Sequence, residues 1–461
     1  MNPRRRRSVT RPCIAMMVLC LCSASGFSRA EPVAAMVDTS DRLIGALRAN
    51  EPAALEPYFD DALRSAAPHE RVVEQWEALA AHVGALGPCE TGVPSTRGAI
   101  AIVEYRCMFA RAPMTIRFAW TDRGRLAGYF FVASPVATPL PAGATEVLVT
   151  TGAPGWPLPA SLVLPKSPVR PPVVVFVHGS GPQDRDETIG PNKPFRDLAY
   201  GLAARGVASL RYDKRTFVHG DRFRAERPNW TLDDQIVDDA VAAIRLAQSR
   251  EDLGPLFIVG HSEGAWLAPR IAATATSRGA RVAGVVMLEA NLTPLAVLLV
   301  EQFAFAAQGA NPRVTAAMLE EEKVKRDHVA ALVAAASRGP LDLDSSPVAR
   351  QSLPLGMPAS AWLDIAHYDP AVALLAQPRL PALLAFGQRD FQVPIREKAL
   401  WESRLGARGN TTLVAFSDLN HLLIEGSGPM SATEYARPGH VAQTVIGTVV
   451  AWIAAIASAS S

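Results

Sequence analysis

The alternation of apolar and polar positions divides the chain into two regions. In residues 31–134, two segments with helical spacing precede three that alternate or run apolar as strands. After residue 145, strand-like runs alternate with helix-like segments, a pattern typical of a mostly parallel sheet covered on both faces. The Pro/Ala/Gly-rich stretch 135–145 predicts a linker between them. We therefore expect a small α+β domain of unknown role at 31–134 and an α/β domain at 146–461.

The first region predicts helices followed by an antiparallel sheet, and the second predicts eight strands. In the first region we expect helices at 41–49 and 70–83 and strands at 99–109, 114–121 and 126–133, with a hairpin turn at 122–124. In the second region the strand candidates are 146–151, 160–164, 173–177, 208–212, 256–259, 282–288, 382–386 and 412–416. Its helix candidates are 195–204, 231–248, 265–275, 396–405 and 441–457, and Thr231 is expected to cap the second of them.

An insertion at about 292–377 interrupts this rhythm. We expect it to be helical at 295–307 and 316–336, with Thr293 as the cap and Pro294 in the first turn of its first helix. Ligands bind at the carboxyl edge of such sheets, so an insertion there favours a lid over the active site. The alternative is a helical bundle that only buttresses the sheet.

The first thirty residues have the pattern of a secretory signal peptide. Arginines at 4–7 precede an apolar run at 13–22 that is too short to span a bilayer, and Ser28-Arg29-Ala30 fits a cleavage site. Removal of residues 1–30, which include six arginines, would change the formal net charge from +2 to −4. We expect a periplasmic or secreted chain without a stable membrane anchor, and its charge gives no reason to expect nucleic acid as a partner.

The cysteine pattern agrees with export. Only Cys89 and Cys107 lie outside the predicted signal peptide, and an oxidising compartment would favour a disulfide between them, worth about 3 kcal/mol. Two buried free thiols are the alternative. Because the sequence has no C-x-x-C, no H-E-x-x-H and no other metal-ligand spacing, we expect no metal and no cofactor.

The most informative motif is Gly260-His261-Ser262-Glu263-Gly264, which follows a buried strand and precedes a helical segment. Glycines two residues before and after a serine permit the sharp strand-to-helix turn on which a nucleophilic serine is exposed. The motif predicts Ser262 as a nucleophile. Its hydroxyl needs a base, because the serine must lose its proton as it attacks a carbonyl.

His421 is the predicted base and Asp390 the predicted acid. Each follows a strand, so each is expected at the carboxyl edge of the sheet, where the carboxylate can hold the imidazole in the correct tautomer. Asp418 is the alternative acid, although it lies only three residues from His421. The other histidines after Ser262 are interpreted as surface or capping residues: His328, His367 and His440.

An oxyanion hole needs two backbone N–H groups directed at the developing charge. We expect one from Glu263, directly after the nucleophile, and the other from Ser180, with Gly181 as the alternative. His178, in the same loop, is interpreted as a structural residue. The charged run 183–187 is either ordinary loop polarity or pairs with Arg211, Lys214 and Arg215.

Several segments together resemble a bacterial branch of α/β-hydrolase esterases, also labelled serine aminopeptidase-like, and the similarity spans nearly the whole second region. They are 177–195, which contains His-Gly-Ser-Gly-Pro-Gln-Asp-Arg-Asp-Glu, and 210–215, 260–264, 388–393 and 419–422. The resemblance implies an α/β-hydrolase fold, carboxylesterase activity and the roles of Asp390 and His421. The first region resembles a domain of unknown function that is often fused ahead of such esterases.

The leading hypothesis is an exported serine hydrolase that cleaves small-molecule carboxylic esters through an acyl-enzyme. A peptidase, an acyltransferase and a catalytically silent envelope-binding protein are the alternatives, and the last is disfavoured because all three triad residue types occur in order. The sequence leaves the natural substrate, the acyl-chain length and the oligomeric state open.

Overall fold

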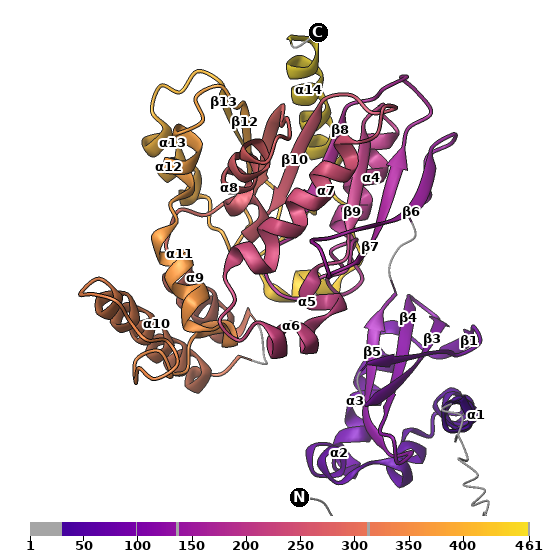
Figure 1. Cartoon of the computed structure of the whole chain (residues 1–461). Helices are drawn as coiled ribbons and strands as arrows, with labels where there is room; N and C mark the ends of the chain where they lie inside the picture. The colour runs from indigo at the N-terminus through magenta and orange to yellow at the C-terminus, as the bar shows by residue number, and fades with distance from the viewer. Residues whose placement is uncertain (1–29, 98, 135–137, 311–313, 460–461) are drawn as a thin grey trace, which may run out of the picture. The chain divides into compact units, whose positions relative to one another are not determined.

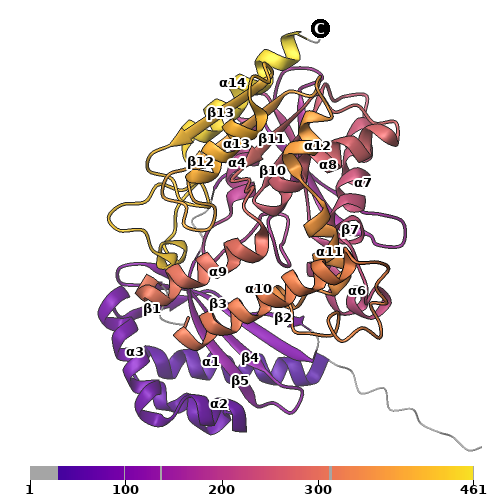
Figure 2. The same ribbon diagram turned by 90° about the vertical axis from the view of Figure 1, so that its left-hand side faces the viewer.

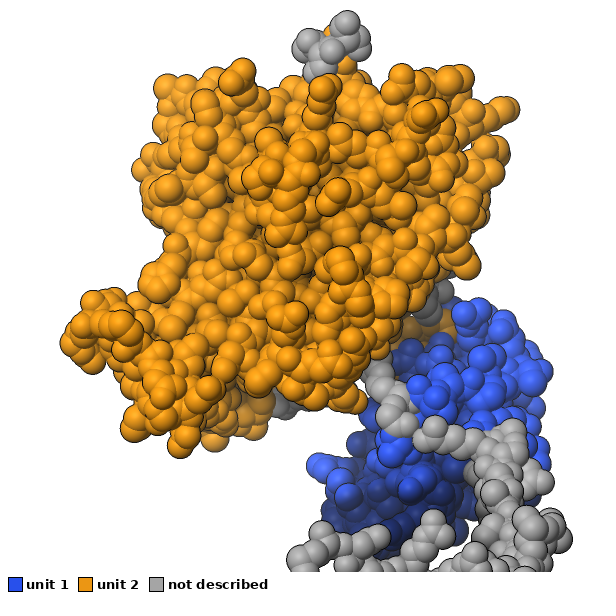
Figure 3. Space-filling view, viewed as in Figure 1, with its two compact units in different colours: residues 1–131 blue, residues 132–461 orange. Residues whose placement is uncertain are grey.

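A computed structural model describes residues 30–97, 99–134, 138–310 and 314–459. The predicted signal peptide, except Ala30, lies outside the described residues, as do positions 135–137 of the predicted linker. The chain forms two compact units that meet in sequence between Phe131 and Val132 (Figure 3). The predicted linker had placed this change a few residues later.

In its described residues, the first unit consists of four helical segments and a five-stranded sheet. Its strand order is β1-β3-β4-β5, with β2 paired to β3. Inward-facing residues alternate along β3 and β4, and Val103, Ile116 and Phe118 are fully buried. The helical elements are α1 (Ala30–Arg48), η1 (Pro52–Tyr58), α2 (Asp61–Ala66) and α3 (His69–Val83), and the strands are β1 (Leu86–Cys89), β2 (Val93–Arg97), β3 (Ile100–Phe109), β4 (Pro113–Trp120) and β5 (Leu126–Ala133).

A disulfide joins the first unit's sheet across its edge. Cys89 of β1 and Cys107 of β3 lie opposite each other in the ladder, and their sulfurs are bonded. The short strands β1 and β2 had no prediction, because their glycine, prolines and polar residues give little strand signal.

The second unit is built on an eight-stranded, mostly parallel sheet, as predicted (Figure 1). The order is β13-β12-β11-β10-β8-β9-β7-β6, and only β7 runs against the rest. Its strands are β6 (Thr145–Thr151), β7 (Leu158–Leu164), β8 (Val173–Val177), β9 (Ala208–Tyr212), β10 (Leu256–His261), β11 (Gly284–Leu288), β12 (Ala382–Gly387) and β13 (Thr411–Phe416).

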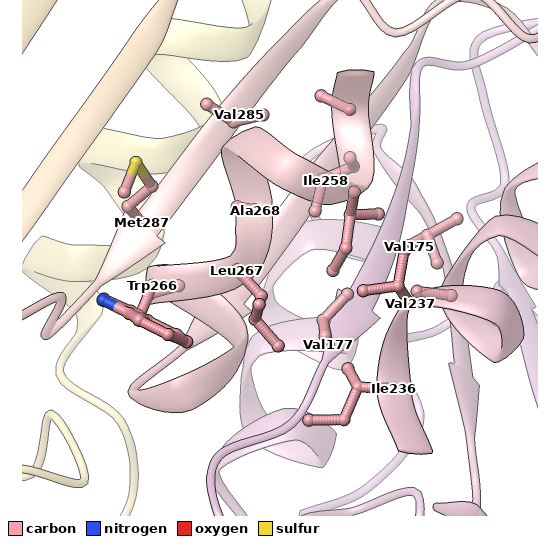
Figure 4. Close-up of a cluster of buried hydrophobic side chains, with 14 of the residues drawn as sticks. Val175, Val177, Ile236, Val237, Ile258, Trp266, Leu267, Ala268, Val285 and Met287 are labelled. Atoms are coloured by element: carbon pink, nitrogen blue, oxygen red, sulfur yellow. The ribbon is translucent and has the colours of Figure 1, made fainter. Parts of the chain in front are cut away.

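Helices cover both faces of this sheet, so its central strands are apolar throughout. Val175 and Val177 of β8 face one core, which contains α7 and α8 (Figure 4), whereas Val174 and Phe176 face a second core with α4 and α14. The helices are α4 (Pro194–Ala203), α5 (Arg215–Val218), α6 (Gly220–Glu226), α7 (Asp238–Gln248), α8 (Glu263–Ser277), α13 (Arg396–Leu405) and α14 (Gln443–Ala459).

The predicted cap of α7 is wrong in detail. A π-helical turn, η2 (Asp233–Val237), precedes α7, and the Thr231 backbone N–H and hydroxyl both donate to the Asp234 carboxylate, at 2.9 Å each. The carboxylate, rather than the threonine oxygen, accepts these bonds.

The insertion is helical, and α9, α10 and α11 lie side by side in it (Figure 2). Its elements are α9 (Leu295–Phe305), η3 (Ala306–Ala310), α10 (Ala316–Ala336), η4 (Pro354–Gly356), α11 (Ala359–His367) and α12 (Pro370–Leu375). Helix α9 starts at Leu295 as predicted, but its predicted cap is wrong: Pro294 is the N-cap, and the Thr293 hydroxyl bonds to Glu397 instead. None of the helices among the described residues is long and apolar enough to cross a membrane.

Candidate active site

The predicted nucleophile lies on a strained turn between β10 and α8. Ser262 has φ 52° and ψ −116°, which a non-glycine residue rarely adopts. Both motif glycines are required because backbone atoms of neighbouring residues lie too close for a side chain. A Cβ on Gly260 would lie 2.3 Å from the Gly264 oxygen, and one on Gly264 would lie 2.1 Å from the Val177 oxygen. The turn therefore holds Ser262 at the carboxyl edge of the sheet.

His421 and Asp390 are brought together at the same edge. His421 Nδ1 lies 2.6 Å from Asp390 Oδ2, and both side chains are buried. The other carboxylate oxygen of Asp390 accepts the N–H groups of Gln392 at 2.7 Å and Val393 at 2.9 Å, so the acid is held from its own loop. This is the geometry in which a carboxylate orients an imidazole as a general base.

The alternative acid does not face His421. Asp418 is exposed, and its carboxylate accepts a hydrogen bond from the neighbouring Ser417 hydroxyl at 2.9 Å. Two of the remaining candidate histidines have other partners, since His328 contacts the Ser352 carbonyl and His440 contacts Asp197. His367 is the last residue of the insertion helix 359–367.

The two residues predicted to form the oxyanion hole lie beside the nucleophile. Ser180, Glu263 and Ser262 line one cavity, and α9 closes part of it. Gly181, the alternative, has φ 81° and turns the chain next to Ser180. His178 is structural, as interpreted: its Nε2 lies 3.0 Å from the Asp184 carbonyl, and burial lowers its pKa to about 4.

A buried ion pair connects the oxyanion loop, the segment after β8 that carries Ser180, to the loop that carries His421. Glu187 accepts the Gly179 N–H at 2.7 Å with one oxygen, and its other oxygen lies 3.1 Å from His261 Nδ1. His261 Nε2 lies 2.8 Å from the main-chain oxygen of His421. Each ring nitrogen of His261 therefore faces an oxygen atom, an arrangement that favours the doubly protonated ring.

The charges of this pair stabilise each other against burial. Burial alone would raise the pKa of the Glu187 carboxyl, but the positive charge and hydrogen bond of His261 hold this pKa below its usual value. Burial alone would lower the pKa of His261, and the Glu187 carboxylate raises it above its usual value. Each group therefore favours the charged form of the other.

The rest of the charged run 183–187 pairs only partly as predicted. Asp186 pairs with the buried Arg211, as expected. Lys214 instead donates from Nζ to Glu263 at 2.9 Å and to the Gly179 carbonyl at 2.8 Å, and Arg215 pairs with Asp239. Lys214 thus joins the two segments that carry the predicted oxyanion donors.

A second buried carboxyl, Glu289, was missed by sequence reasoning. It directly follows β11, is fully buried, and accepts the Gly387 N–H at 2.6 Å. Burial, and then the negative charge of Asp390, raise the pKa of Glu289 well above its usual range, which favours the neutral form of this carboxyl. The signal was present in the sequence, since an acidic residue ends an otherwise apolar strand and is expected at the active-site edge.

Backbone strain is concentrated around these residues. Seven non-glycine residues in the described part of the chain have positive φ, and five of them lie at or next to the site: Glu187, Ser262, Glu289, Leu355 and Leu423. Strained backbone of this kind is maintained only where the surrounding structure enforces it. Within the described residues, no group of three or more His, Cys, Asp or Glu side chains could hold a metal ion.

Comparison with known proteins identifies relatives across most of the second unit. Residues 174–433 match the model of the alpha/beta hydrolase family. The chain is 33% identical over 359 residues to Esterase EstD of Thermotoga maritima. This match covers 76% of this chain and 79% of the relative.

Solved structures of similar fold are more distant. Est1E from Butyrivibrio proteoclasticus is 15% identical with a TM-score of 0.43, covering 68% of this chain and 99% of its own. The hyperthermophilic esterase from Pyrobaculum calidifontis is 18% identical with a TM-score of 0.40, covering 68% of this chain and 86% of its own.

Proposed function

Because the chain belongs to the alpha/beta hydrolase family and is a hydrolase, we propose that it cleaves carboxylic esters of small molecules by a Ser-His-Asp acyl-enzyme mechanism. The observation that carries this proposal is the His421–Asp390 contact of 2.6 Å at the sheet edge where the strained Ser262 turn also lies. The 33% identity to a protein named an esterase supports the ester as substrate.

In the proposed first half-reaction, Ser262 Oγ attacks the ester carbonyl carbon and its proton passes to His421 Nε2. The carbonyl oxygen becomes an oxyanion that the N–H groups of Ser180 and Glu263 stabilise, while Asp390 stabilises the imidazolium. When the carbon–oxygen bond of the leaving alcohol breaks, that oxygen takes the proton from His421. The acyl group is then bonded to Ser262.

In the second half-reaction, water attacks the acyl-enzyme. His421 takes the proton from water, a second oxyanion forms in the same hole, and its collapse returns the proton to Ser262 Oγ and releases the carboxylic acid. Lys214 and Glu187 hold the loop of the oxyanion hole during both steps, through the Gly179 carbonyl and N–H respectively.

The substrate class is tested by comparing esters with amides. An amine must be protonated as it leaves, whereas an ester alcohol needs less help, so a peptidase depends on additional anchoring of the chain. We expect kcat/KM for short-acyl p-nitrophenyl esters at least about 100-fold above that for aminoacyl p-nitroanilides, or about 2.7 kcal/mol. Equal or reversed values would contradict the ester proposal and favour an aminopeptidase-like activity.

We also propose that the chain is exported to the periplasm or the medium and loses residues 1–30. The basic and apolar pattern of these residues supports the proposal, and a disulfide between Cys89 and Cys107 suits an oxidising compartment. N-terminal sequencing of the protein from cell fractions should find Glu31 first, outside the cytoplasm. An intact Met1 in the cytoplasmic fraction would contradict export.

A further inference from the structure

The cavity beside Ser262 is small and largely apolar. It measures about 50 Å³, and apolar side chains from α9 form much of its wall, including Leu298 and Leu299. A cavity needs about 10–15 Å³ on the same measure to hold one water molecule, so this inner cavity has room for only a short chain.

A second, outer cavity of about 350 Å³ adjoins the inner one. Four residues line both cavities, and we call them the dividing wall: Trp266, Asn291, Leu295 and Ile365. The outer cavity continues past this wall to side chains of α10 and α11, including Val329 and Ala366. Removing part of the wall would therefore join a small space to one several times larger.

Trp266 is the largest member of the dividing wall and is held firmly. It is 9% exposed, and its ring meets the Tyr368 ring edge-on at a centroid distance of 4.7 Å. The Tyr368 hydroxyl also donates to the Trp266 carbonyl at 3.1 Å. The backbone N–H of Trp266 donates to the Ser262 carbonyl at 2.9 Å. This bond fixes the position of the Trp266 backbone relative to the nucleophile.

The residues that line the two cavities indicate which part of an ester the cavities would hold. The leaving alcohol must approach His421 to take its proton, and among the described residues that line the two cavities His421 is absent. Both Trp266 and the predicted oxyanion donor Glu263 lie in the first turns of α8. The inner cavity therefore includes the predicted oxyanion donor Glu263 in its wall and neither cavity includes the histidine that would protonate the leaving alcohol, which favours the acyl chain as the occupant.

We propose that the dividing wall sets the length of the acyl chain that the enzyme accepts. The wall closes the inner cavity to all but short acyl chains. When the wall is opened, the outer cavity accommodates a longer aliphatic chain. This inference rests on the proposed ester function and adds its substrate class, esters of short aliphatic acids.

The test measures kcat/KM for p-nitrophenyl esters from acetate to decanoate. In the unchanged enzyme, kcat/KM should be highest for acetate to butyrate. Trp266→Ala should raise the ratio of octanoate to acetate at least about 30-fold, since each newly buried methylene contributes about a fourfold factor. The same measurement is made on acetate esters of alcohols from ethanol to octanol. An unchanged octanoate-to-acetate ratio, or a change confined to the acetate esters of longer alcohols, would overturn the proposal.

Two further variants separate the wall from a general loosening of the fold. Ile365→Ala opens the same wall with a smaller loss of packing and should shift the ratio in the same direction. In the Trp266→Ala background, Ala366→Trp should reverse the shift, because exposed Ala366 lines only the outer cavity and a large side chain there fills it. Failure of this reversal would overturn the role of the outer cavity.

The matched control is Val297→Ala. This residue lies on α9 between wall and cavity residues but is 39% exposed and lines neither cavity. Its chain-length profile should equal that of the unchanged enzyme, and a shift like that of Trp266→Ala would overturn the proposal.

Phosphonate labelling distinguishes failure of this inference from failure of the proposed function. The rate at which p-nitrophenyl alkylphosphonates modify Ser262 reports on the cavities without ester turnover. A chain-length preference that Trp266→Ala relaxes, in an enzyme that hydrolyses no ester, would contradict the ester function and still support the wall. Equal labelling rates for all chain lengths in both proteins would overturn the wall alone.

Discussion

The two candidate acids, Asp390 and Asp418, have different hydrogen-bond partners, and these partners favour Asp390 as the acid. Asp390 accepts two backbone N–H groups and contacts His421, whereas Asp418 is exposed and turned to Ser417. Asp390→Asn should lower kcat about 10⁴-fold by favouring the wrong histidine tautomer. Asp418→Asn should change kcat by less than about threefold, as expected of a surface position. Steady-state kinetics of the two variants measures both changes in kcat. A larger loss of kcat in Asp418→Asn than in Asp390→Asn would contradict the assignment of Asp390 as the acid.

Glu289 is a neutral hydrogen-bonding group beside the acid in this account. Glu289→Gln keeps an acceptor for the Gly387 N–H and should retain kcat within about fivefold, whereas Glu289→Ala removes that acceptor and should cost about 1–3 kcal/mol of stability. Urea unfolding and ester kinetics measure both effects. Comparable kcat for the alanine and glutamine variants would show that this carboxyl has no positioning role.

The raised pKa of Glu289 also predicts a dependence of stability on pH. Its protonated form is favoured in the folded state, so its contribution is fully present below the unfolded value of about 4.5 and is lost as pH rises toward the folded pKa. The unfolding free energy of the natural protein should therefore fall relative to that of Glu289→Gln as pH increases above about 4.5. A constant difference between pH 4 and 8 would contradict a neutral Glu289.

Among the elements, the loop after β8 depends most on buried charge. Glu187→Gln leaves the His261 imidazolium without its anion, and breaking a buried pair in this way costs about 3–5 kcal/mol. Since Glu187 has a lowered pKa and His261 a raised one, the loss should be largest between about pH 4.5 and 6.5. It should shrink as pH rises through the folded pKa of His261.

Unfolding curves at several pH values measure this loss, with Glu226→Gln as control. Glu226 pairs with Arg222 on the surface of α6, so its replacement should leave stability nearly unchanged. The oxyanion loop is also misplaced in Glu187→Gln, which should lower kcat about 10- to 100-fold. Equal stability losses in the two variants at all pH values would contradict a structural role for the Glu187–His261 pair.

The elements that sequence reasoning predicted well are those whose apolar pattern is decided locally. Strand β8 and helices α10 and α13 begin and end where expected, because continuous apolar runs or helical stripes end at clear polar positions. The predicted caps of α9 and α7 were wrong, since a distant and a neighbouring carboxylate, Glu397 and Asp234, accept the hydroxyl hydrogen bonds. Such competition for a hydroxyl cannot be read from local sequence.

The residues of the candidate site also separate into those that local pattern indicates and those whose contacts depend on distant segments. Ser262, Asp390 and His421 follow from strand ends and motif spacing. The contacts of Glu187, His261 and Lys214 depend on which loops meet in three dimensions, so their pairing was not predictable from local pattern.

At the scale of the whole molecule, two compact units have separate cores, and all the residues of the proposed site belong to the second. Replacing Cys89 and Cys107 by serine removes a crosslink over 18 residues, worth about 3 kcal/mol. Calorimetry should show a lower unfolding temperature for the first unit only, with ester kcat/KM unchanged. Equal destabilisation of both units would contradict their separate folding.

The central claim is that Ser262 carries the acyl group, and labelling of this residue tests it most directly. Fluorophosphonate labelling followed by peptide mapping should modify Ser262 alone, and Ser262→Ala should abolish labelling and lower kcat about 10⁶-fold. Modification of a different serine, or undiminished ester turnover in Ser262→Ala, would contradict the account.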